Sequence, residues 1–316
     1  MKKYTSVDDI LNLNELLNLA KKIKANPLSN KYLGKDKTIG LLFFNPSLRT
    51  RLSTQKAARN LGMDCMVMNL NTEGWTLEFE DGTVMDGIAS EHIKEAAKVI
   101  SQYCDIIAIR CFPTLRDKEK DEEETVISSF VKYATVPVIS LEGATEHPLQ
   151  ALADALTIEE YKKTERPKVV LSWAPHPKAL PQSVSNSFVK IMKKMEVDFI
   201  ITHPEGYELN PEITKGVPIE YNQEKAFKNA DFIYAKNWSN YTNYGKIISE
   251  DPKWTISKRQ MELTNHARFM HCLPVRRNMI VNDDILDSEA SIVIPEANNR
   301  TYSAQTILTK ILERLI

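Results

Sequence analysis

The fold of this chain is organised around residues 43–52, which read Phe-Phe-Asn-Pro-Ser-Leu-Arg-Thr-Arg-Leu. The apolar run 37–44 leads into this stretch and is short and bounded by turn-forming residues, which favours a buried strand. Beyond the turn, alanine and leucine recur at helical spacing until Gly62, so a helix follows. Pro46 and Ser47 lie where that helix would begin. The stretch therefore predicts a strand, a polar turn and a helix.

The start of that helix collects groups that bind anions. Its first backbone N–H groups have no partner within the helix and carry a partial positive charge. Ser47 and Thr50 add two hydroxyls, and Arg49 and Arg51 add two guanidiniums that form charge-assisted, forked bonds with phosphate. We therefore predict a phosphate site at this turn. The alternative is an ordinary surface helix start with solvated arginines.

Length and composition narrow the class of protein. A chain of 316 residues is long enough for two domains with separate cores. The 41 basic and 42 acidic residues create no overall field for nucleic acid or an anionic membrane. No apolar run resembles a signal peptide or a membrane span. The four cysteines lack metal-type spacing, which favours reduced thiols in a cytoplasmic protein without a metal site.

Two common cofactor motifs are missing. The 10 glycines form neither the G-x-G-x-x-G pattern of dinucleotide sites nor the G-x-x-x-x-G-K-[ST] pattern of P-loops. We therefore expect no cofactor, and small-molecule substrates as the only ligands.

Strand and helix patterns alternate along both halves of the chain. In the first half the expected strands are 37–44, 64–70, 105–110 and 136–140, with a polar loop over 71–87 and one helix over 116–133. In the second half they are 168–173, 197–202, 231–235, 268–271 and 291–294, and a closing helix spans 301–316. This alternation predicts an α/β protein of two doubly wound parallel-sheet domains. We expect the first domain over 1–147, with the closing helix packed back on it, and the second over 148–300.

Polar side chains follow many of these strands. Ligands of parallel sheets bind at the carboxyl ends of the strands, so the set predicts an active site in the cleft between the domains. Each member has a structural alternative, since Arg110 could pair with a carboxylate, His147 could simply start a helix, and Cys272 could be a small buried hydrophobe. The set comprises Arg110, Glu142, His147, Gln150, Trp173, His176, Lys236, Cys272 and Arg300.

Three motifs carry a family resemblance. Ser47-Leu48-Arg49-Thr50-Arg51, His147-Pro148-Leu149-Gln150 and His271-Cys272-Leu273-Pro274 resemble the signatures of the aspartate/ornithine carbamoyltransferases, in the order found in that family. The third motif points to the ornithine side of the family. The resemblance implies a carbamoyl-phosphate domain, an amino-acid domain, a homotrimer with active sites at subunit interfaces, and a place in arginine biosynthesis.

The chain departs from ordinary ornithine enzymes in one region. Their Ser-Met-Gly loop, which holds the free α-amino acid end of ornithine, is replaced here by Lys-Asn-Trp-Ser-Asn-Tyr over 236–241. With Trp75 and the segment 173–177, this resembles the branch that uses N-acetyl- or N-succinylornithine. At the position that aligns with Ser90, the N-acetylornithine enzymes of this branch look to have Glu and the N-succinylornithine enzymes look to have Pro. Ser90 matches neither, but Lys178 and Lys236 would attract an extra carboxylate, which favours N-succinylornithine.

The resemblance also implies the role of each site residue. Catalysis would fall to Arg49, Thr50, Arg110, His147 and Arg300. Carbamoyl phosphate would bind to Ser47, Leu48, Arg49, Thr50, Trp75 of a neighbouring subunit, Arg110, His147, Gln150, Cys272, Leu273 and Arg300. The acylornithine would bind to Glu142, His176, Lys178, Lys236, Arg276 and Ser90, the last from a loop that reaches a neighbouring site. The alternatives are an ornithine or aspartate carbamoyltransferase and a non-catalytic anion-binding protein on the same fold.

Overall fold

The chain divides into two compact units. In the computed structural model, which describes residues 1–315, unit 1 comprises residues 1–114, 119–149 and the chain from Arg300 onward. Unit 2 comprises Leu115–Lys118 and Gln150–Asn299. The boundaries expected from the sequence lay after residues 147 and 300. The short segment 115–118 is grouped with unit 2, a feature that the sequence patterns did not suggest.

Unit 1 is built on a five-stranded parallel sheet in the order β1-β7-β6-β2-β3. The strands are β1 (Lys3–Tyr4), β7 (Val138–Glu142), β6 (Ile106–Arg110), β2 (Thr38–Phe43) and β3 (Asp64–Asn69). Phe43 pairs with Arg110, and Arg110 pairs with Glu142 across a β-bulge. The carboxyl ends of β2, β6 and β7 therefore lie side by side, and the polar residues at these ends are brought together.

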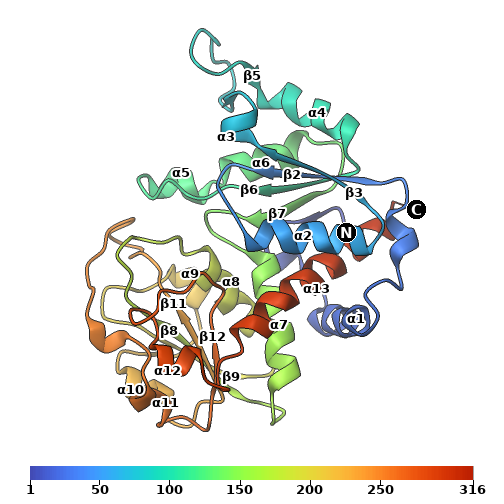
Figure 1. Cartoon of the computed structure of the whole chain (residues 1–316). Coiled ribbons are helices and arrows are strands. Elements are labelled where there is room, and N and C mark those ends of the chain that lie inside the picture. The colour runs from blue at the N-terminus through green and yellow to red at the C-terminus, as the bar shows by residue number, and fades with distance from the viewer. Residues whose placement is uncertain (316) are drawn as a thin grey trace. The chain divides into compact units, whose positions relative to one another are not determined.

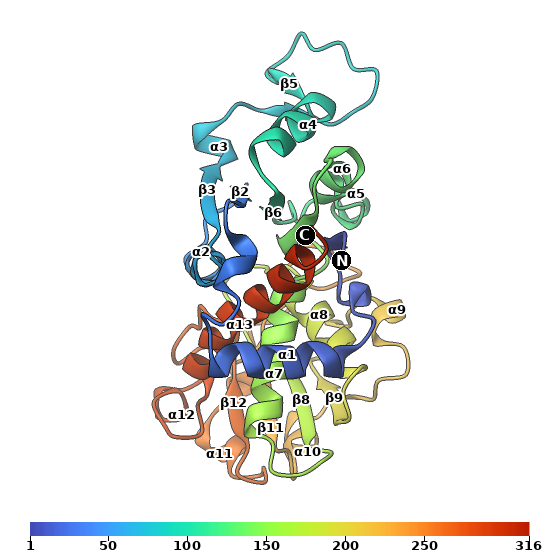
Figure 2. The same cartoon turned by 90° about the vertical axis from the view of Figure 1, so that its right-hand side faces the viewer.

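Helices cover both faces of this sheet (Figures 1 and 2). On one face lie α4 (Ile93–Tyr103) and α6 (Thr125–Tyr133), whose apolar residues Ile93 and Phe130 join a core with Ile107 and Ile109 of β6. On the other lie α2 (Arg49–Asn60), α1 (Leu13–Ala25) and the C-terminal part of α13 (Val293–Leu312). Helix α1 begins after Asn12, whose side chain caps it by accepting a hydrogen bond from Glu15 N.

Unit 2 repeats the architecture with the order β10-β9-β8-β11-β12, all parallel. Its strands are β10 (Ile219–Glu220), β9 (Asp198–Thr202), β8 (Lys168–Trp173), β11 (Phe232–Lys236) and β12 (Arg268–Met270). Helix α8 (Ser183–Met192) lies on one face, where Phe188 stacks on Tyr234. Residues of α10 (Gln223–Phe227) and α12 (Asp283–Leu286) join the core of the other face. Strand β11 is buried along its whole length, as expected of a central parallel strand.

The remaining elements are short, apart from one helix. Helix α7 (Pro148–Tyr161) starts in unit 1 and continues into unit 2, and it is buried on all sides until Ile158. The short elements of unit 2 include α9 (Pro211–Thr214) and α11 (Lys258–Met261). The predicted fold class, two doubly wound parallel-sheet domains, is confirmed. In the chain up to residue 315, no helix joins the length and the apolar character that a membrane span requires.

The predicted strand 291–294 is wrong. Only Ser291 bridges to Phe269, and helix α13 begins at Val293. A serine followed by three apolar residues does not distinguish a strand from a helix start. Pro295 suits the first turn of α13, where its missing N–H has no helical partner to lose. The closing helix therefore starts eight residues before the predicted position, Ser291 to Asn299 hold no strand, and Arg300 lies inside the helix.

Two further predictions need correction. The charged segment 116–133 forms two helices, α5 (Lys118–Glu122) and α6, because Glu124 adopts a left-handed conformation with φ of 51°. Its carboxylate accepts hydrogen bonds from Ala144 N at 3.0 Å and Thr145 N at 2.6 Å, which offset the conformational strain. The predicted loop 71–87 contains the end of α3 (Leu70–Glu73) and β4 (Leu77–Glu78), which pairs with β5 (Glu91–His92).

Candidate active site

The turn after β2 leaves backbone and side-chain donors available. Leu48 occupies the N-cap position of α2 and gives no side-chain cap, so the first N–H groups of the helix keep their capacity to bind a ligand. Arg49 Nε is buried and has no hydrogen-bond partner among residues 1–315. Asn45 Oδ1 accepts a hydrogen bond from Phe112 N at 2.6 Å, which ties the turn to the loop after β6. Arg51, the second arginine expected at this turn, instead donates to Asn69 Oδ1 at 3.0 Å. The helix N–H groups and Arg49 are therefore the donors at this turn that suit the predicted phosphate.

Arg110 bridges the turn and the end of β7. Its Nη1 donates to the Pro46 carbonyl at 3.0 Å, and its Nη2 lies 3.2 Å from Glu142 Oε2. Both side chains of this ion pair are 9% exposed. Burial lowers the pKa of Arg110, while the charge of Glu142 acts in the opposite direction. Arg110 Nε is buried without a hydrogen-bond partner in the described chain, so one strong donor remains for a ligand.

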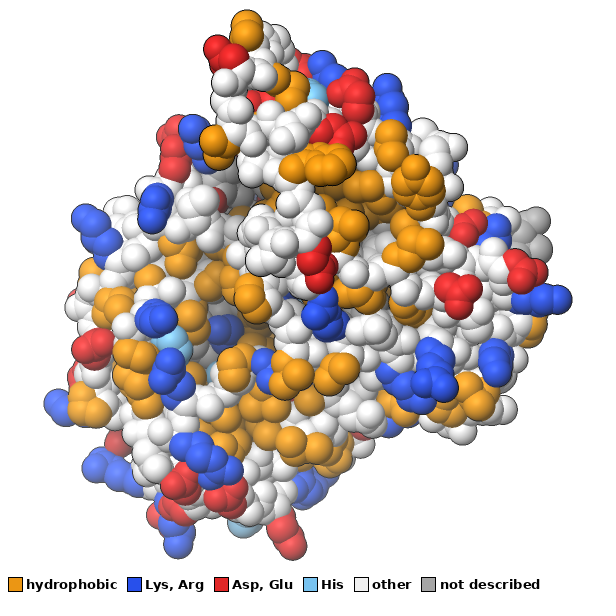
Figure 3. All heavy atoms as spheres, turned by 45° about the horizontal axis from the view of Figure 1, so that its top comes forward, with side chains coloured by type: hydrophobic (Ala, Val, Ile, Leu, Met, Phe, Trp, Pro, Cys, Tyr) orange, Lys and Arg blue, Asp and Glu red, His pale blue; other side chains and the backbone are white. Residues whose placement is uncertain are grey.

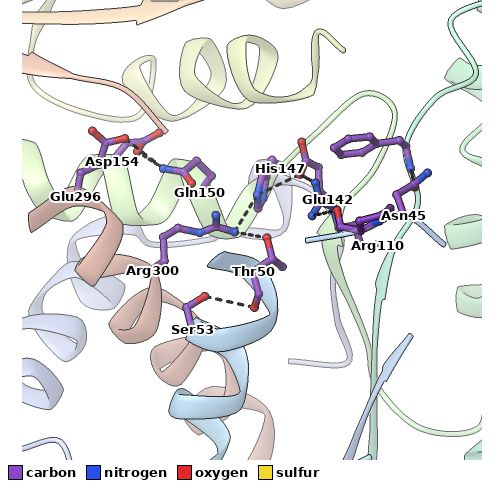
Figure 4. Close-up of polar contacts among 12 residues, drawn as sticks. Asn45, Thr50, Ser53, Arg110, Glu142, His147, Gln150, Asp154, Glu296 and Arg300 are labelled. Carbon is purple, nitrogen blue, oxygen red and sulfur yellow. Dashed lines mark hydrogen bonds and ion pairs between the residues drawn. The ribbon is translucent and has the colours of Figure 1, made fainter. Parts of the chain in front are cut away.

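Arg300 joins the helix start to His147. Its Nη2 donates to Thr50 Oγ1 at 2.6 Å and lies 3.1 Å from His147 Nε2 (Figure 4). Because a guanidinium can only donate, His147 Nε2 accepts this bond and the ring proton sits on Nδ1. Burial, followed by the charges of Arg300 and Arg110, holds the pKa of His147 well below its usual range. The imidazole is therefore neutral at physiological pH and acts as a hydrogen-bonding group.

These contacts assemble one polar group in unit 1, comprising Thr50, Arg110, Glu142, His147 and Arg300. The sequence predicted all five as site residues, and Figure 4 shows their side chains pointing toward one another. The sequence predicted Arg300 just after a strand. In the structure it lies in the interior of helix α13. Glu142 Oε2 also lies 3.6 Å from His147 Nε2, a proximity that the sequence did not indicate. Because this nitrogen carries no proton, the two groups form no ion pair.

Trp75 and Ser90 flank the paired short strands β4 and β5 of unit 1. Trp75 is 60% exposed, and its Nε1 donates to Glu91 Oε2 at 2.8 Å. The backbone N–H of Ser90 donates to the Thr76 carbonyl at 3.0 Å. No hydrogen bond among residues 1–315 joins either residue to Thr50, and from the sequence both are expected to serve a neighbouring subunit.

Unit 2 places Gln150 beside the loop after β12. Gln150 Nε2 donates to Asp154 Oδ1 at 2.7 Å and to Glu296 Oε1 at 3.4 Å. Glu296 Oε2 accepts a hydrogen bond from His271 N at 2.9 Å, immediately before Cys272 and Leu273. The sequence predicted Gln150, Cys272 and Leu273 but missed the two carboxylates. Asp154 follows Gln150 by one helical turn, which is a weak signal, whereas nothing in the sequence marks Glu296.

The remaining predicted residues lie at the strand ends of unit 2. Arg276 Nε donates to His176 Nε2 at 3.0 Å, and burial lowers the pKa of His176. Lys178 follows on the same loop and is exposed. Lys236 is the last residue of β11 and only 8% exposed, yet no carboxylate of the described chain pairs with its ammonium group. A buried cation without an acidic partner suits an anionic ligand.

Two tryptophans support this end of unit 2. Trp173 Nε1 donates to the Trp238 carbonyl at 3.2 Å, and Trp238 Nε1 donates to the Tyr207 carbonyl at 2.7 Å. Both indoles are fully buried. They therefore fix the backbone beside Lys236.

Comparison with known proteins identifies the family. A family model described as "Aspartate/ornithine carbamoyltransferase, carbamoyl-P binding domain" matches residues 2–160, and one described as "Aspartate/ornithine carbamoyltransferase, Asp/Orn binding domain" matches residues 181–311. The chain belongs to the aspartate/ornithine carbamoyltransferase family. It is a carbamoyltransferase. The family predicted from the three motifs is confirmed.

Similar carbamoyltransferases cover the whole chain. The N-succinylornithine carbamoyltransferase of Bacteroides thetaiotaomicron is 55% identical over 100% of both chains. The N-acetylornithine carbamoyltransferase of Xanthomonas axonopodis pv. citri is 38% identical over 94% of this chain and 92% of the relative. A solved structure of a mutant N-acetyl-L-ornithine transcarbamylase, complexed with carbamyl phosphate and N-succinyl-L-norvaline, has a TM-score of 0.93 and 36% identity. It covers 98% of this chain and 100% of the other.

The surface fits an enzyme of small ligands. On the face in Figure 3, acidic and basic side chains are interspersed, in keeping with a formal net charge of −1. With no overall field of one sign, any cation that serves this carbamoyltransferase must act locally, and Arg49, Arg110 and Arg300 are the arginines predicted for the site.

Proposed function

We propose that this carbamoyltransferase transfers the carbamoyl group of carbamoyl phosphate to the δ-amine of an N-acylated ornithine. The products are N-acylcitrulline and phosphate, and the expected setting is arginine biosynthesis. The observation that carries the proposal is the group formed by Thr50, Arg110, His147 and Arg300 beside the uncapped start of α2. This group offers several fixed donors to an anion and to a polarised carbonyl.

The phosphate of the substrate binds at the start of α2 in this proposal. Ser47, the Leu48 N–H, Arg49 and Thr50 hold its oxygens, and the helix N-terminus favours its charge. Arg49 Nε, buried without a partner in the described chain, supplies one of the bonds. Trp75 of a neighbouring subunit closes the phosphate site.

The carbamoyl oxygen binds to Thr50, Arg110 and His147. Attack by the δ-amine forms the N–C bond and places negative charge on this oxygen, where preorganised donors contribute most. The C–O bond to phosphate then breaks, and Arg300 neutralises the leaving phosphate. The amine releases one proton, which the departing phosphate accepts. A neutral His147 suits this role because its Nδ1–H can donate a hydrogen bond while the lowered pKa keeps the ring uncharged near pH 7.

The residues of unit 2 hold the other groups. The side chain of Gln150 and the backbone carbonyls of Cys272 and Leu273 orient the carbamoyl NH₂. The acylornithine binds through Glu142, His176, Lys178, Lys236, Arg276 and the Ser90 loop of a neighbouring subunit, which holds its δ-amine against the carbamoyl carbon.

N-succinylornithine is the preferred acceptor in this proposal. A succinyl group carries one more carboxylate than an acetyl group, so the extra charge needs a cation. Lys236 is buried with no acidic partner in the described chain, and Lys178 and Arg276 add positive charge. Ser90 contributes no negative charge that would repel a succinyl carboxylate. The name of the 55%-identical relative supports the same choice.

The proposed homotrimer is supported by an exposed apolar surface on unit 1. Strand β3 is at the edge of its sheet, and Met66 and Met68 are exposed along it. Leu48 and Leu52 of the α2 region are also exposed. Exposed apolar side chains beside an edge strand are typical of a protein interface. The free state of all four cysteines fits the cytoplasmic setting expected from the sequence.

One assay tests the proposal directly. The purified enzyme is given carbamoyl phosphate with ornithine, N-acetylornithine, N-succinylornithine or aspartate, and each ureido product is identified by mass spectrometry. We expect N-succinylcitrulline to form with the highest kcat/KM. Product from free ornithine alone would overturn the acylornithine assignment. Phosphate binding without any product would instead support a non-catalytic anion-binding protein.

A mixing experiment tests the shared site. Trp75→Ala and Arg110→Ala are each expected to be inactive as separate homotrimers. The two variants are dissociated, mixed and allowed to reassemble. If Trp75 serves a neighbouring subunit, some sites of a mixed trimer combine Arg110 from one subunit with Trp75 from the next, and we expect these intact sites to restore activity. Mass measured by light scattering checks the trimer. Continued inactivity of verified mixed trimers would place Trp75 and Arg110 in the same subunit's site.

A further inference from the structure

Two fully buried carboxylates flank the Gln150 side chain. Asp154 on α7 and Glu296 on α13 both have 0% relative exposure, and Gln150 is 1% exposed. Burying ionised groups is strongly unfavourable unless each one has good hydrogen bonds. The mechanism proposed above gives neither carboxylate a role, so their position beside a substrate-binding amide needs an explanation.

Their geometry determines which way the Gln150 amide points. A carboxylate only accepts hydrogen bonds, so the NH₂ group of Gln150 must face Asp154 Oδ1 at 2.7 Å and Glu296 Oε1 at 3.4 Å. A flipped amide would place its carbonyl oxygen against two carboxylate oxygens and lose both bonds. Figure 4 shows the Gln150 side chain aimed at Asp154 and Glu296 in this way. Gln150 Oε1 is left buried without a hydrogen-bond partner in residues 1–315.

The same pair also holds the loop after β12. Glu296 Oε2 accepts the His271 N–H at 2.9 Å, and His271 Nδ1 accepts the Leu273 N–H at 2.8 Å. Cys272 and Leu273 therefore follow a backbone position that Glu296 fixes. Tyr234 packs in this region, and burial, followed by the charges of Asp154, Cys272 and Glu296, raises its pKa well above its ordinary range. Its hydroxyl stays neutral and adds no further charge.

We propose that Asp154 and Glu296 are positioning residues that make the site selective for an amide-bearing donor substrate. By binding the Gln150 NH₂, they leave Gln150 Oε1 as an acceptor for one N–H of the carbamoyl group. Acetyl phosphate has the same shape but carries CH₃ in place of NH₂, so it cannot satisfy this buried oxygen. This inference rests on the proposed function in one respect only, that Gln150 contacts the carbamoyl NH₂.

The first test measures ligand binding. Dissociation constants for carbamoyl phosphate and acetyl phosphate are measured by calorimetry with no acceptor present, for the wild type and for Asp154→Asn/Glu296→Gln. The new amides keep the volume but no longer force one orientation of Gln150. We expect affinity for carbamoyl phosphate to fall about 10-fold, the order of one buried hydrogen bond, and affinity for acetyl phosphate to stay within about twofold. An equal loss for both ligands would overturn the proposal.

A matched control lies on the same two helices. Glu160 of α7 accepts a hydrogen bond from Asn299 Nδ2 of α13 at 2.8 Å, which is again an amide bonded to a carboxylate between these helices. Glu160→Gln should leave both dissociation constants unchanged. A shift in the ratio of the two constants in this variant would show that any altered α7–α13 contact disturbs selectivity, and the proposal would fail.

A double-mutant cycle separates positioning from general structure. Gln150→Ala removes the amide through which the carboxylates are proposed to act. In this background, Asp154→Asn/Glu296→Gln should cause no further loss of carbamoyl phosphate affinity. A full additional 10-fold loss would refute the mechanism. If the double substitution fails to fold, Glu296→Gln alone is taken through the same cycle. Because no acceptor is present, failure of the acylornithine assignment leaves these results unaffected.

Discussion

Arg110 gives the sharpest test of the oxyanion role. We consider Arg110→Met, which keeps most of the side-chain volume but removes the charge and all N–H donors. In the native site Arg110 donates to the Pro46 carbonyl and pairs with Glu142 at 3.2 Å, while its Nε has no partner in the described chain. The substitution therefore has two separable effects, one on folding and one on turnover.

The two effects have different magnitudes. Removing one partner of a buried ion pair leaves Glu142 uncompensated, and such changes typically cost about 3–5 kcal/mol of stability. Loss of one oxyanion donor costs about 10²–10³ in kcat. Adding Glu142→Gln removes the uncompensated charge, so we expect much of the stability to return while kcat stays low. Glu142 is also a proposed acylornithine ligand, so the double variant is compared with Glu142→Gln alone. That comparison distinguishes an unfolded enzyme from a folded enzyme that lacks its donor.

The assay follows both quantities in each variant. Denaturant unfolding gives the stability, and initial rates at saturating carbamoyl phosphate and N-succinylornithine give kcat. If Arg110→Met in a folded enzyme turns over within about threefold of the wild type, far from the 10²-fold loss expected, Arg110 is not an oxyanion donor. If Glu142→Gln fails to restore stability to Arg110→Met, the buried pair does not act as described.

Three other variants probe single contacts. Thr50→Val removes the hydroxyl that accepts a hydrogen bond from Arg300 at 2.6 Å. We expect kcat/KM for carbamoyl phosphate to fall about 10-fold or more. Thr50→Ser keeps the hydroxyl and should retain most of the wild-type kcat/KM. Lys236→Met should raise KM for N-succinylornithine about 10-fold or more, because a charged hydrogen bond is lost. KM for carbamoyl phosphate should stay unchanged. An unchanged KM for N-succinylornithine would show that Lys236 does not bind the acceptor. His147 has a lowered pKa in the folded enzyme, so its contribution to stability is present above about pH 6.5 and is lost as the pH falls below that value. The thermal midpoint of His147→Gln should therefore fall less than that of the wild type between pH 7 and pH 5.5, and equal slopes would contradict the assigned pKa.

Local patterns were sufficient to predict the fold class and part of the site. The run 37–44, the turn and the helix after it lie next to one another in the chain, so their spacing determines a strand, an anion-binding turn and a helix. Arg110 and His147 could be predicted because each lies at or just after a strand, and the carboxyl ends of parallel strands meet at one edge. Motif order along the chain was enough for the family.

Tertiary structure decided what those residues touch. The short run Ile292 to Ile294 fits a strand or a helix equally well, and only packing makes α13 begin at Val293. This helix carries Arg300 to Thr50 across 250 residues of sequence. The contact of Asp154 and Glu296 with the Gln150 amide likewise exists only because α7 and α13 pack against each other in the folded chain. Spacing in the sequence encodes local geometry, whereas the charge balance of a buried site depends on which distant residues fold against it.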